Sequence, residues 1–596
     1  MCGICGELRF DGAEADLAAI ERMTEALVPR GPDHGGSWSD GSLGFGHRRL
    51  SIIDLSERAH QPMVDPELGL ALVFNGTIYN YRALRTPLSA RGYRFFSEGD
   101  TEVILKAYRE WGPACVEHLH GMFAIGLWDL RERTLFLARD RFGIKPLYWT
   151  ADGRRLRFAS SPQALLAGGG VDTGIDPAGL QFQFTLHAVI PAPMTLLKGV
   201  RKLPPAHTLT IAQDGIGSPV PYWHLEAVRE PGQVTEADWI DRTHAALLAA
   251  VRRRQEAADV PVGVLLSGGL DSSLIVALMA ELGGVEQLHT FSVGFEDHPD
   301  EKGSEFEYSD QVVARYGTRH HKFLVPNSEA LRRLPEAVDA MAEPMFGQDA
   351  VGFYLLAERV SESIKVVQSG QGADEVFGGY FWYPRMGAET AGTRLERFRR
   401  HYFDRDYPEL MDLIAPDYQA PDAVVPYIGA RLDEPGSDGF LDAVLRLDAT
   451  TLIVDDPVKR VDNMTMAFGL EARVPFLDHE LVELVARCPP ELKLRSDGKH
   501  LLKAIARGRL PDAVIDRAKG YFPMPALKYV RGEFLGFMRD ILESRACRER
   551  GLYQRAYVDR LLAEPEAHHT RILGSKLWHL AVLELWLQRN LGPRRT

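Results

Sequence analysis

The middle of the chain reads Val262-Gly263-Val264-Leu265-Leu266-Ser267-Gly268-Gly269-Leu270-Asp271-Ser272-Ser273. The apolar run predicts a buried parallel strand, and the paired glycines allow a tight turn into a helix. Backbone N–H groups at such a helix start bind anions, and the serine hydroxyls add donors. A carboxylate beside a phosphate requires a cation, so we assign Asp271 to Mg²⁺. The stretch predicts a phosphate loop, and the alternative is an ordinary strand–turn–helix junction.

A second glycine-rich loop, Ser369-Gly370-Gln371-Gly372-Ala373-Asp374-Glu375-Val376-Phe377-Gly378-Gly379-Tyr380, follows another predicted strand. Ligands of open α/β sheets bind at the carboxyl ends of strands, so we expect both loops at one site. Asp374 is a candidate second metal ligand opposite Asp271. The alternative, that Asp374 and Glu375 are acidic residues at a helix N-terminus, is compatible with it. The chain has no G-x-x-x-x-G-K-[ST] motif, which argues against a P-loop kinase or GTPase.

The region around these loops alternates between predicted strands and helices. A helix over 237–255 precedes the first loop, and strands are predicted at 288–293, 322–325 and 364–368. Such alternation is typical of a parallel sheet in an α/β domain. Beyond Phe381 the pattern is mainly helical.

The first 210 or so residues have a different pattern. The stretches 70–74 and 122–128 alternate as sheet strands do, and helices are predicted over 14–27 and 101–111. Strands that come in sequential pairs favour antiparallel sheets with covering helices. The region 215–231 is rich in Gly, Pro and Gln, which indicates a linker. We therefore expect domains at 1–214 and 235–596, joined by a linker at 215–234.

Composition excludes several function classes. The 596 residues carry a net charge of −13, which argues against a nucleic-acid surface. The five cysteines form no disulfide framework, and no second pair follows Cys2 and Cys5 at zinc spacing. No apolar run is long enough for a membrane span, and Glu7, Arg9 and Asp11 stand where a signal peptide needs apolar residues. We expect a cytoplasmic protein; a homodimer is compatible with the sequence.

Cys2 is the candidate nucleophile of the first part. Removal of Met1, which the small second residue permits, would give Cys2 both a thiol and a free α-amine. A thiolate is a strong nucleophile, and an α-amine with an ordinary pKa of about 7.7–8.0 can act as its base. A lone cysteine is weak evidence, so this reading depends on the rest of the chain.

Cys2 and the two glycine loops, in this order, resemble the glutamine-hydrolysing asparagine synthetases over nearly the whole chain. Within that family the chain is similar to the N-acetylglutaminylglutamine amidotransferases. The strings that carry the family resemblance are Arg30–Asp33, Arg49–Ile52, Asn75-Gly76, Gly99-Asp100, Arg139–Tyr148 and Glu471–Asp478. The strings that carry the narrower one are Glu7–Gly12, Ser369–Glu375 and Asp455–Met464.

The resemblance implies an N-terminal-nucleophile hydrolase domain, an α-β-β-α sandwich, in which Cys2 attacks the glutamine side-chain amide. Asn75 and the Gly76 N–H would form the oxyanion hole. Arg49 would bind the α-carboxylate of glutamine and Asp100 its α-ammonium. Leu50, Ile52 and Thr77 would complete the glutamine site. Each has a simpler alternative: a surface ion pair for Arg49, a hairpin turn for Asn75-Gly76 and a helix N-cap for Asp100.

The second domain would be a pyrophosphate-loop synthetase, an α/β fold with a helical C-terminal part. It would activate a carboxylate with ATP, and ammonia from the first domain would then displace AMP. Ammonia would move through an internal passage between the domains. Asp271 and Asp374 would hold Mg²⁺, and Lys519 would steady charge at the α-phosphorus, the alternative being a solvated loop lysine. The implied ATP residues are Leu265, Ser267, Gly268, Gly269, Asp271, Ser272, Val293, Ser369 and Gly370.

Two departures from the family pattern affect these expectations. Thr77 replaces the glutamate of the usual N-G-E motif, so Asp100 would carry the substrate ammonium alone. Gln371 stands where asparagine-forming enzymes have a glutamate, and a carboxamide is no base near pH 7. We interpret Gln371 as a catalytic-site residue that positions an acceptor other than aspartate. The phosphate of the adenylate or Glu375 would then take the proton, unless the synthetase half is weakened.

The leading hypothesis is a glutamine-dependent amidotransferase whose acceptor is the C-terminal carboxylate of an N-acetylated glutaminylglutamine dipeptide, giving an amide osmolyte. Asparagine synthesis from aspartate is the main alternative. A regulatory protein with an inactive synthetase half is disfavoured by Asp271, Asp374 and Lys519. A phosphoribosyl amidotransferase would share Cys2 but not the 267–273 loop.

Overall fold

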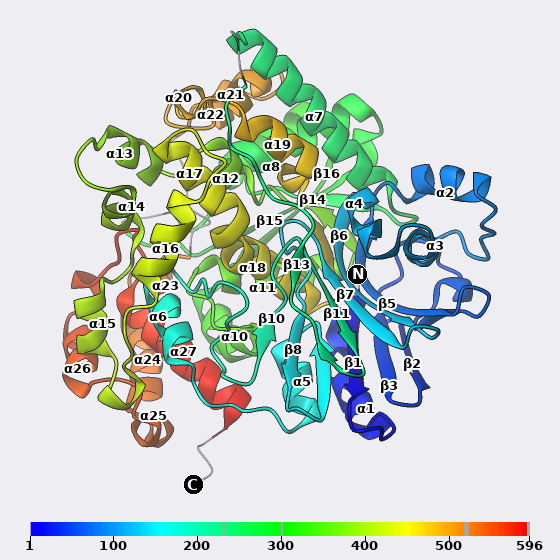
Figure 1. Cartoon of the computed structure of the whole chain (residues 1–596). Coiled ribbons are helices and arrows are strands. Elements are labelled where there is room, and N and C mark those ends of the chain that lie inside the picture. The colour runs from blue at the N-terminus through cyan, green and yellow to red at the C-terminus, as the bar shows by residue number, and fades with distance from the viewer. Residues whose placement is uncertain (1, 231, 233, 300–301, 518–523, 593–596) are drawn as a thin grey trace.

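The computed structural model describes residues 2–230, 232, 234–299, 302–517 and 524–592 (Figure 1). Within residues 2–221 the strands form two antiparallel sheets. One sheet has the order β10 (Arg201–Lys202), β8 (Tyr148–Ala151), β9 (Arg155–Ala159), β1 (Cys2–Arg9), β3 (Leu43–Arg49) and β2 (His34–Asp40). The other has the order β12 (Gly215–Ile216), β11 (His207–Ala212), β7 (Thr134–Arg139), β6 (Gly121–Asp129), β5 (Leu70–Ile78) and β4 (Met63–Asp65).

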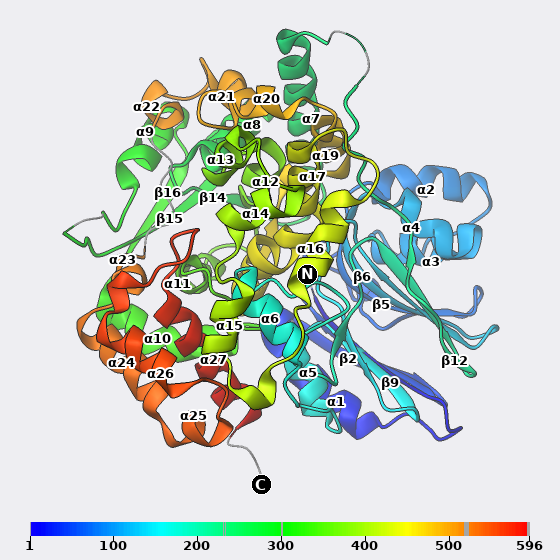
Figure 2. The same ribbon diagram turned by 60° about the vertical axis from the view of Figure 1, so that its left-hand side comes forward.

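The two sheets pack face to face because their strands bury apolar residues on both sides. In β5, Ala71 and Val73 lie in the core between the sheets, whereas Leu72 and Phe74 lie in the core toward the helices. Helices α1 (Leu17–Glu25) and α5 (Pro162–Gly168) cover the first sheet. Helices α2 (Tyr81–Ala90), α3 (Thr101–Trp111) and α4 (Cys115–His118) lie on the side of the second (Figure 2). The expected α-β-β-α sandwich is confirmed.

The stretch expected to be a linker differs in part from the expectation. Residues 215–216 form β12, and β13 (Val220–Pro221) also pairs with β11. Gly215 and Pro221 of this region therefore lie in short edge strands that pair with β11. The sheet thus extends seven residues, 215–221, beyond the expected domain end.

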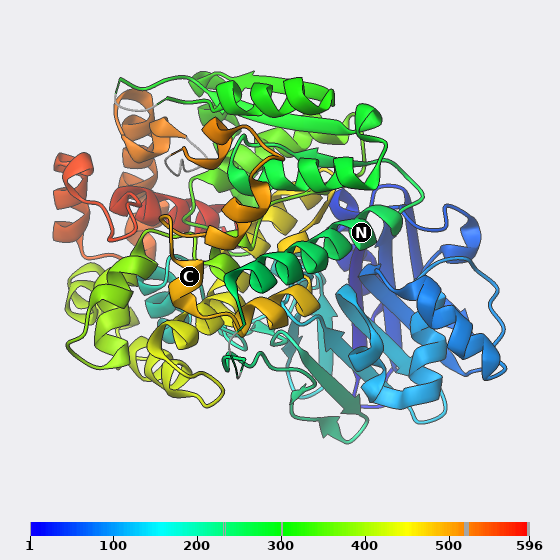
Figure 3. The ribbon, with the colours of Figure 1, turned by 90° about the horizontal axis from the view of Figure 1, so that it is seen from above.

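The second part contains a parallel sheet with the order β16 (Arg319–Val325), β15 (His289–Phe295), β14 (Val262–Leu265), β17 (Val366–Gln368) and β18 (Glu471–Arg473). Helices α7 (Glu236–Glu256), α8 (Leu270–Leu282), α9 (Phe306–Tyr316) and α11 (Asp349–Ser361) pack around it (Figure 3). The predicted strands are all present, and the α/β class is confirmed. The sequence reading missed β18, which lies in the helical region and is three residues long.

The rest of the second part is mainly helical, as expected. Two π-helical turns, Asp448–Leu452 and Val454–Val458, precede α18. Among the described residues, no helix has the length and apolar character needed to cross a membrane. The remaining helices are α6 (Pro177–Thr185), α10 (Asn327–Asp339), α12 (Ala373–Phe377), α13 (Trp382–Ala388), α14 (Arg394–Tyr402), α15 (Tyr407–Leu413), α16 (Val424–Asp433), α17 (Phe440–Leu447), α18 (Lys459–Met466), α19 (His479–Ala486), α20 (Pro490–Lys493), α21 (His500–Ala506), α22 (Asp512–Ile515), α23 (Pro525–Lys528), α24 (Gly532–Glu543), α25 (Arg545–Arg550), α26 (Arg555–Ala563) and α27 (Lys576–Leu591).

Buried charges join the two parts of the chain. Asp462, on α18, accepts hydrogen bonds from Arg30 at 3.0 and 3.3 Å and from the Lys145 ammonium at 3.0 Å. Burial opposes ionisation of Asp462, but the two cations hold its pKa below the ordinary value. Arg30 also donates from Nε to the carbonyl of Cys2 at 3.2 Å. The interface therefore fixes the start of β1 as well as α18.

We expect Asp462→Asn to destabilise the full chain strongly. The substitution leaves Arg30 and Lys145 buried without their anion, and breaking a buried pair in this way costs about 3–5 kcal/mol. The free energy of unfolding of the full chain in urea measures this loss. The control is Lys365→Gln, which removes the half-exposed pair between Lys365 and Asp33 across the same interface and costs about 0–1 kcal/mol. Equal losses for both variants would contradict the central role of Asp462.

Candidate active sites

Cys2 is the first residue of β1 and lies across from Arg49 in the sheet. Its backbone N–H donates to Oδ1 of Asn75 on β5 at 3.1 Å, so the two sheets meet at this point. Asn75 and Gly76 lie within β5, which excludes the hairpin turn considered from the sequence. The structure thus brings the candidate nucleophile next to the predicted oxyanion-hole residues.

Asn75 has a donor available for an oxyanion. Its side chain is fully buried, and among the described residues its Nδ2 has no hydrogen-bond partner. The next position requires glycine, because a Cβ on Gly76 would lie 2.1 Å from the carbonyl oxygen of Met122. A buried donor without a partner is costly, which is consistent with a site arranged for a ligand atom.

The Cys2 thiol is not ionised in the resting site. Burial raises its pKa above the ordinary value, although the backbone of Leu50 and the charge of Arg49 act in the opposite direction. A thiol in this state requires a base to become a nucleophile. The arrangement therefore needs a proton acceptor beside Cys2, the role assigned to its own α-amine.

Arg49 is buried, which excludes a surface ion pair. Its guanidinium donates to the carbonyls of Ile53, at 3.3 Å, and of Asp54 and to that of Ser56, at 3.1 Å. The predicted contact with a glutamine carboxylate therefore requires the 53–56 segment to give up part of these bonds. Leu50 and Ile52, which precede this segment, are also buried.

Asp100 precedes α3, but its carboxylate does not cap that helix. It accepts instead from the backbone N–H of Ile78, at 3.0 Å, at the end of β5. Burial raises the pKa of Asp100 to about 6 against the opposing hydrogen bonds. Asp100 thus faces the glutaminase residues and is ionised at neutral pH but not in mild acid.

Thr77 contacts a residue that the sequence reading did not place in this site. Its hydroxyl donates to the Glu471 carboxylate at 3.1 and 3.4 Å. Glu471 is the first residue of β18, so the carboxylate comes from the second part of the chain. Burial opposes its ionisation, yet the nearby Arg473 guanidinium helps to lower the pKa of Glu471 to about 2. Glu471 belongs to the string Glu471–Asp478 that carries the family resemblance. No pattern in the neighbouring sequence indicates that its side chain lies in the glutaminase site.

The second site is a cavity of about 520 Å³ at the carboxyl ends of β14 and β17. All the predicted ATP residues except Gly268 line it, and Gln371 and Asp374 do so as well. Gly268 packs away from it: a Cβ there would lie 2.9 Å from the backbone nitrogen of Ser309. The structure therefore brings both glycine loops to one cavity.

Lys499 lies between the two predicted metal ligands. Its ammonium is 2.6 Å from a carboxylate oxygen of Asp271 and 2.8 Å from one of Asp374. Burial disfavours the charged lysine, but the two carboxylates raise its pKa above the ordinary value. The two carboxylates thus converge on one cation, which is the arrangement a divalent ion also needs. Lys499 lies more than 100 residues from either aspartate, so spacing did not indicate it.

The remaining predicted residues fall in different places. Lys519 lies outside the described residues. Glu375, proposed as a base, does not line the ATP cavity directly, but its carboxylate accepts from the Tyr380 hydroxyl at 2.7 Å. Tyr380 does line this cavity. Tyr380 therefore connects Glu375 to the ATP cavity.

A second cavity of about 170 Å³ adjoins the first. Asp349, Tyr380 and Arg460 line both. Arg460 is bound to Asp456 at 2.6 Å and to Asp349 at 3.1 Å, and Lys528 also lines this cavity, so the two aspartates are balanced by two basic side chains. The far wall includes His187, whose Nδ1 is 3.0 Å from the Asp404 carboxylate. The other walls include the aromatic side chains of Phe346 and Trp382.

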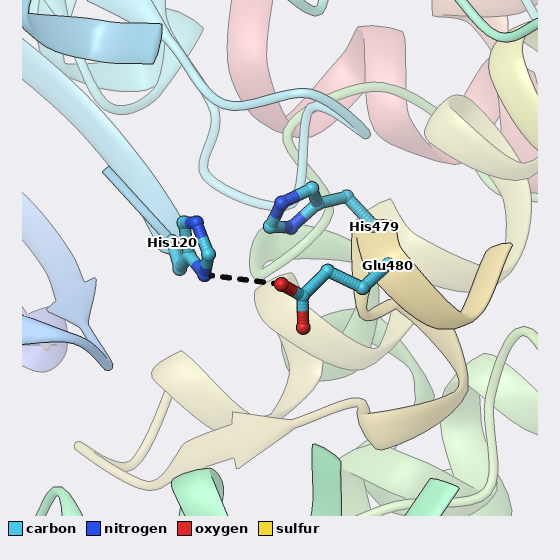
Figure 4. A group of neighbouring side chains, drawn as sticks. All are labelled: His120, His479 and Glu480. Carbon is cyan, nitrogen blue, oxygen red and sulfur yellow. Dashed lines mark ion pairs between the residues drawn. The ribbon is translucent and has the colours of Figure 1, made fainter. Parts of the chain in front are cut away.

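A group of His120, His479 and Glu480 also joins the two parts of the chain (Figure 4). Nδ1 of His120 lies 4.0 Å from a Glu480 oxygen, and the two histidine rings meet edge to face. Burial, followed by the charge of Arg141, lowers the pKa of His479 to about 3. Arg253 is bound to Glu480 as well. This surrounding positive charge opposes a metal ion, so we interpret the group as an interface contact.

Comparison with known proteins agrees with these two sites. Residues 1–223 match the family described as a glutamine amidotransferase domain, and residues 242–588 match asparagine synthase. Asparagine synthetase [glutamine-hydrolyzing] 1 of Bacillus subtilis is 32% identical over 100% of this chain and 98% of that protein. Asparagine synthetase [glutamine-hydrolyzing] 3 of the same organism is 33% identical over 88% of this chain and 87% of its own length.

Asparagine synthetase B of Escherichia coli is 29% identical over 88% of this chain and 82% of that protein. The two matched families cover the two parts of the fold, and each part holds one of the sites described above. The chain therefore belongs to the asparagine synthase family, as a glutamine-hydrolysing, ATP-dependent ligase.

Proposed function

We propose that the chain amidates the C-terminal carboxylate of an N-acetylated glutaminylglutamine dipeptide and so makes the osmoprotectant N-acetylglutaminylglutamine amide. The observation that carries this proposal is the second cavity, which extends the ATP site beyond the volume that aspartate needs. Gln371, in the wall of the ATP cavity, supports it because that position lacks a carboxylate. Asparagine synthesis is the second candidate, and the names of the relatives favour it.

In the glutaminase half, the Cys2 thiol attacks the side-chain carbonyl carbon of glutamine. The α-amine of Cys2 takes the thiol proton and passes it to the departing ammonia. The Asn75 Nδ2 and the Gly76 N–H stabilise the oxyanion that forms, and water then releases glutamate from the thioester. This assignment is supported by the buried Asn75 amide next to the Cys2 backbone.

In the synthetase half, an acceptor carboxylate oxygen attacks the α-phosphorus of ATP and releases pyrophosphate. Ammonia that has crossed the interface attacks the resulting acyl-adenylate, and AMP leaves. Asp271 and Asp374 are the residues that would hold Mg²⁺, which neutralises phosphate charge when bound. Lys499 already supplies one positive charge between them. Lys519 keeps its proposed role at the α-phosphorus.

The acceptor would lie across the boundary between the cavities. Its reacting carboxylate would be near Tyr380, and its amide-rich body would reach toward His187. Burial disfavours protonation of His187, but the Asp404 carboxylate raises its pKa, which favours a donor to an acyl carbonyl. The aromatic walls and the paired charges suit an uncharged body better than the free ammonium of aspartate.

Gln371 stands in place of the usual glutamate base, so another group must remove the proton from the attacking ammonia. Tyr380 and Glu375 offer one route, since the tyrosine can accept this proton while it gives its own to the carboxylate. The adenylate phosphate is the other acceptor. Gln371 would position the acceptor and take no part in proton transfer.

We expect purified enzyme with glutamine and Mg-ATP to form AMP and an amide with N-acetylglutaminylglutamine but not with aspartate. Chromatographic assay of AMP and of the amide product measures both. A glutaminylglutamine dipeptide without the acetyl group is the matched control, because its free ammonium is disfavoured in the second cavity. AMP formation with aspartate as the only acceptor would overturn the proposed product in favour of asparagine.

Variants at Gln371 and Tyr380 are expected to affect different kinetic constants. Gln371→Ala and Gln371→Glu should raise KM for the acceptor roughly tenfold, the effect of losing about 1.4 kcal/mol of binding, with kcat changed less. Tyr380→Phe should lower kcat roughly 100-fold at nearly constant KM, the size typical of a lost proton transfer. Amide formation that is insensitive to both Gln371 variants would show that the positioning role is wrong.

Glutamine binding is expected to weaken in mild acid because Asp100 becomes protonated. The raised pKa of about 6 means that its negative charge is present above pH 6 and is lost as the pH falls through that value. Cys2→Ala permits calorimetric measurement of glutamine binding without turnover. Its Kd should rise up to about tenfold per pH unit below pH 6, and the added Asp100→Asn change should remove this dependence. A constant Kd between pH 7 and 5 would argue against Asp100 as a ligand of the ammonium.

A further inference from the structure

The position that lacks the usual glutamate has a carboxylate beside it in space. Thr77 ends in a hydroxyl, and that hydroxyl contacts both oxygens of Glu471. A glutamate side chain at position 77 would extend past the same point, because it has two more atoms along its length than threonine. A negative charge from another element thus lies at the end of the Thr77 side chain.

We propose that Glu471 binds the α-ammonium of glutamine in the site of Cys2, in place of the glutamate that the motif lacks. This proposal rests on the glutaminase half of the proposed function and is independent of the acceptor. It makes Glu471 a specificity-determining residue: it selects glutamine over amides that have no α-amine.

The surroundings of Glu471 suit a residue that binds the α-ammonium of glutamine. Its side chain is fully buried, and its charge acts on both the Cys2 thiol and the Asp100 carboxyl. Thr77 fixes its position from β5, and Arg473 holds it from the same strand at 2.5 Å. A buried carboxylate that is held by fixed donors is suited to bind a cation without rearrangement.

The two carboxylates of the site contribute differently. Burial raises the pKa of Asp100 to about 6, so its charge depends on the pH. The pKa of Glu471 is lowered to about 2, so its charge is present over the pH range in which Asp100 titrates. Glu471 is therefore the more constant of the two partners for a substrate ammonium. In this arrangement Glu471 shares the charge that was expected to rest on Asp100 alone.

The origin of Glu471 has a structural consequence. Strand β18 pairs with β17, and the carbonyl of Arg473 accepts from the N–H of Ser369, at 2.8 Å, in the second glycine loop. The glutamine site is thus completed by a strand of the ATP-binding sheet.

The test follows glutamate release by the full chain, which does not depend on the acceptor. We expect Glu471→Gln to raise KM for glutamine at least tenfold, with a smaller change in kcat. Its kcat/KM for glutaramic acid, which is glutamine without the α-amine, should stay within twofold. Amide formation from added ammonia should also be unchanged. Glu480→Gln, in the same segment but half-exposed on α19, is the matched control and should leave both substrates unaffected.

A double variant tests whether a carboxylate at position 77 rescues the loss of the Glu471 carboxylate. Thr77→Glu alone should weaken glutamine binding, since it places a second buried anion against Glu471. The double variant Thr77→Glu, Glu471→Gln should restore KM to within about threefold of the unmodified chain, because one carboxylate is again at that place. The kinetics with glutaramic acid separate binding of the ammonium from a structural role, because the loss and its rescue should then appear with glutamine only.

Two results would overturn the proposal. Equal losses of glutamine and glutaramic acid hydrolysis in Glu471→Gln would show that the carboxylate acts on Cys2 or on folding. If KM for glutamine stays high in the double variant, a carboxylate at position 77 cannot replace that of Glu471. The negative charge at this place would then not be what binds glutamine. Absence of glutamate release by the unmodified chain would instead reject the glutaminase half of the proposed function, and aspartate as acceptor would reject only its product.

Discussion

The two active sites depend on charges that are buried where the two parts of the chain meet. The Asp462 carboxylate accepts hydrogen bonds from Arg30 and Lys145, and Arg30 also donates to the carbonyl of Cys2. Charges removed from water are tolerated only when they are paired with good geometry, so the two parts fit together in one way. A glutaminase that supplies ammonia to a distant site requires such a fixed interface, because ammonia released into solvent would be protonated and lost.

The same principle explains the ATP site. Asp271 and Asp374 repel each other when the cavity holds no cation, and the Lys499 ammonium relieves this repulsion from a third element. The ammonium therefore holds the two carboxylates close together. ATP therefore enters a site in which these charges are already in place, which reduces the reorganisation that binding requires.

The features that could be predicted from sequence are those determined by neighbours in the chain. The loop at 267–273 was recognisable because an apolar strand, paired glycines and a helix follow one another, and α3 was found at its observed bounds. Lys499 and Glu471 were not predicted as site residues, since each acts on residues more than 100 positions away. Strand β18 was missed for a related reason: three residues carry too little periodicity, and pairing with β17 makes them a strand.

The short strand β18 has a function that its length does not suggest. A strand rises about 3.3 Å per residue, so its three residues span roughly 10 Å. Glu471 at one end contacts Thr77 in the glutaminase site, and the Arg473 carbonyl at the other binds Ser369 beside the ATP cavity. The backbone of β18 pairs with β17, so one short strand of the ATP-binding sheet contributes to both sites. Replacing the local glutamate by Thr77 therefore makes the glutamine site depend on the ATP-binding sheet.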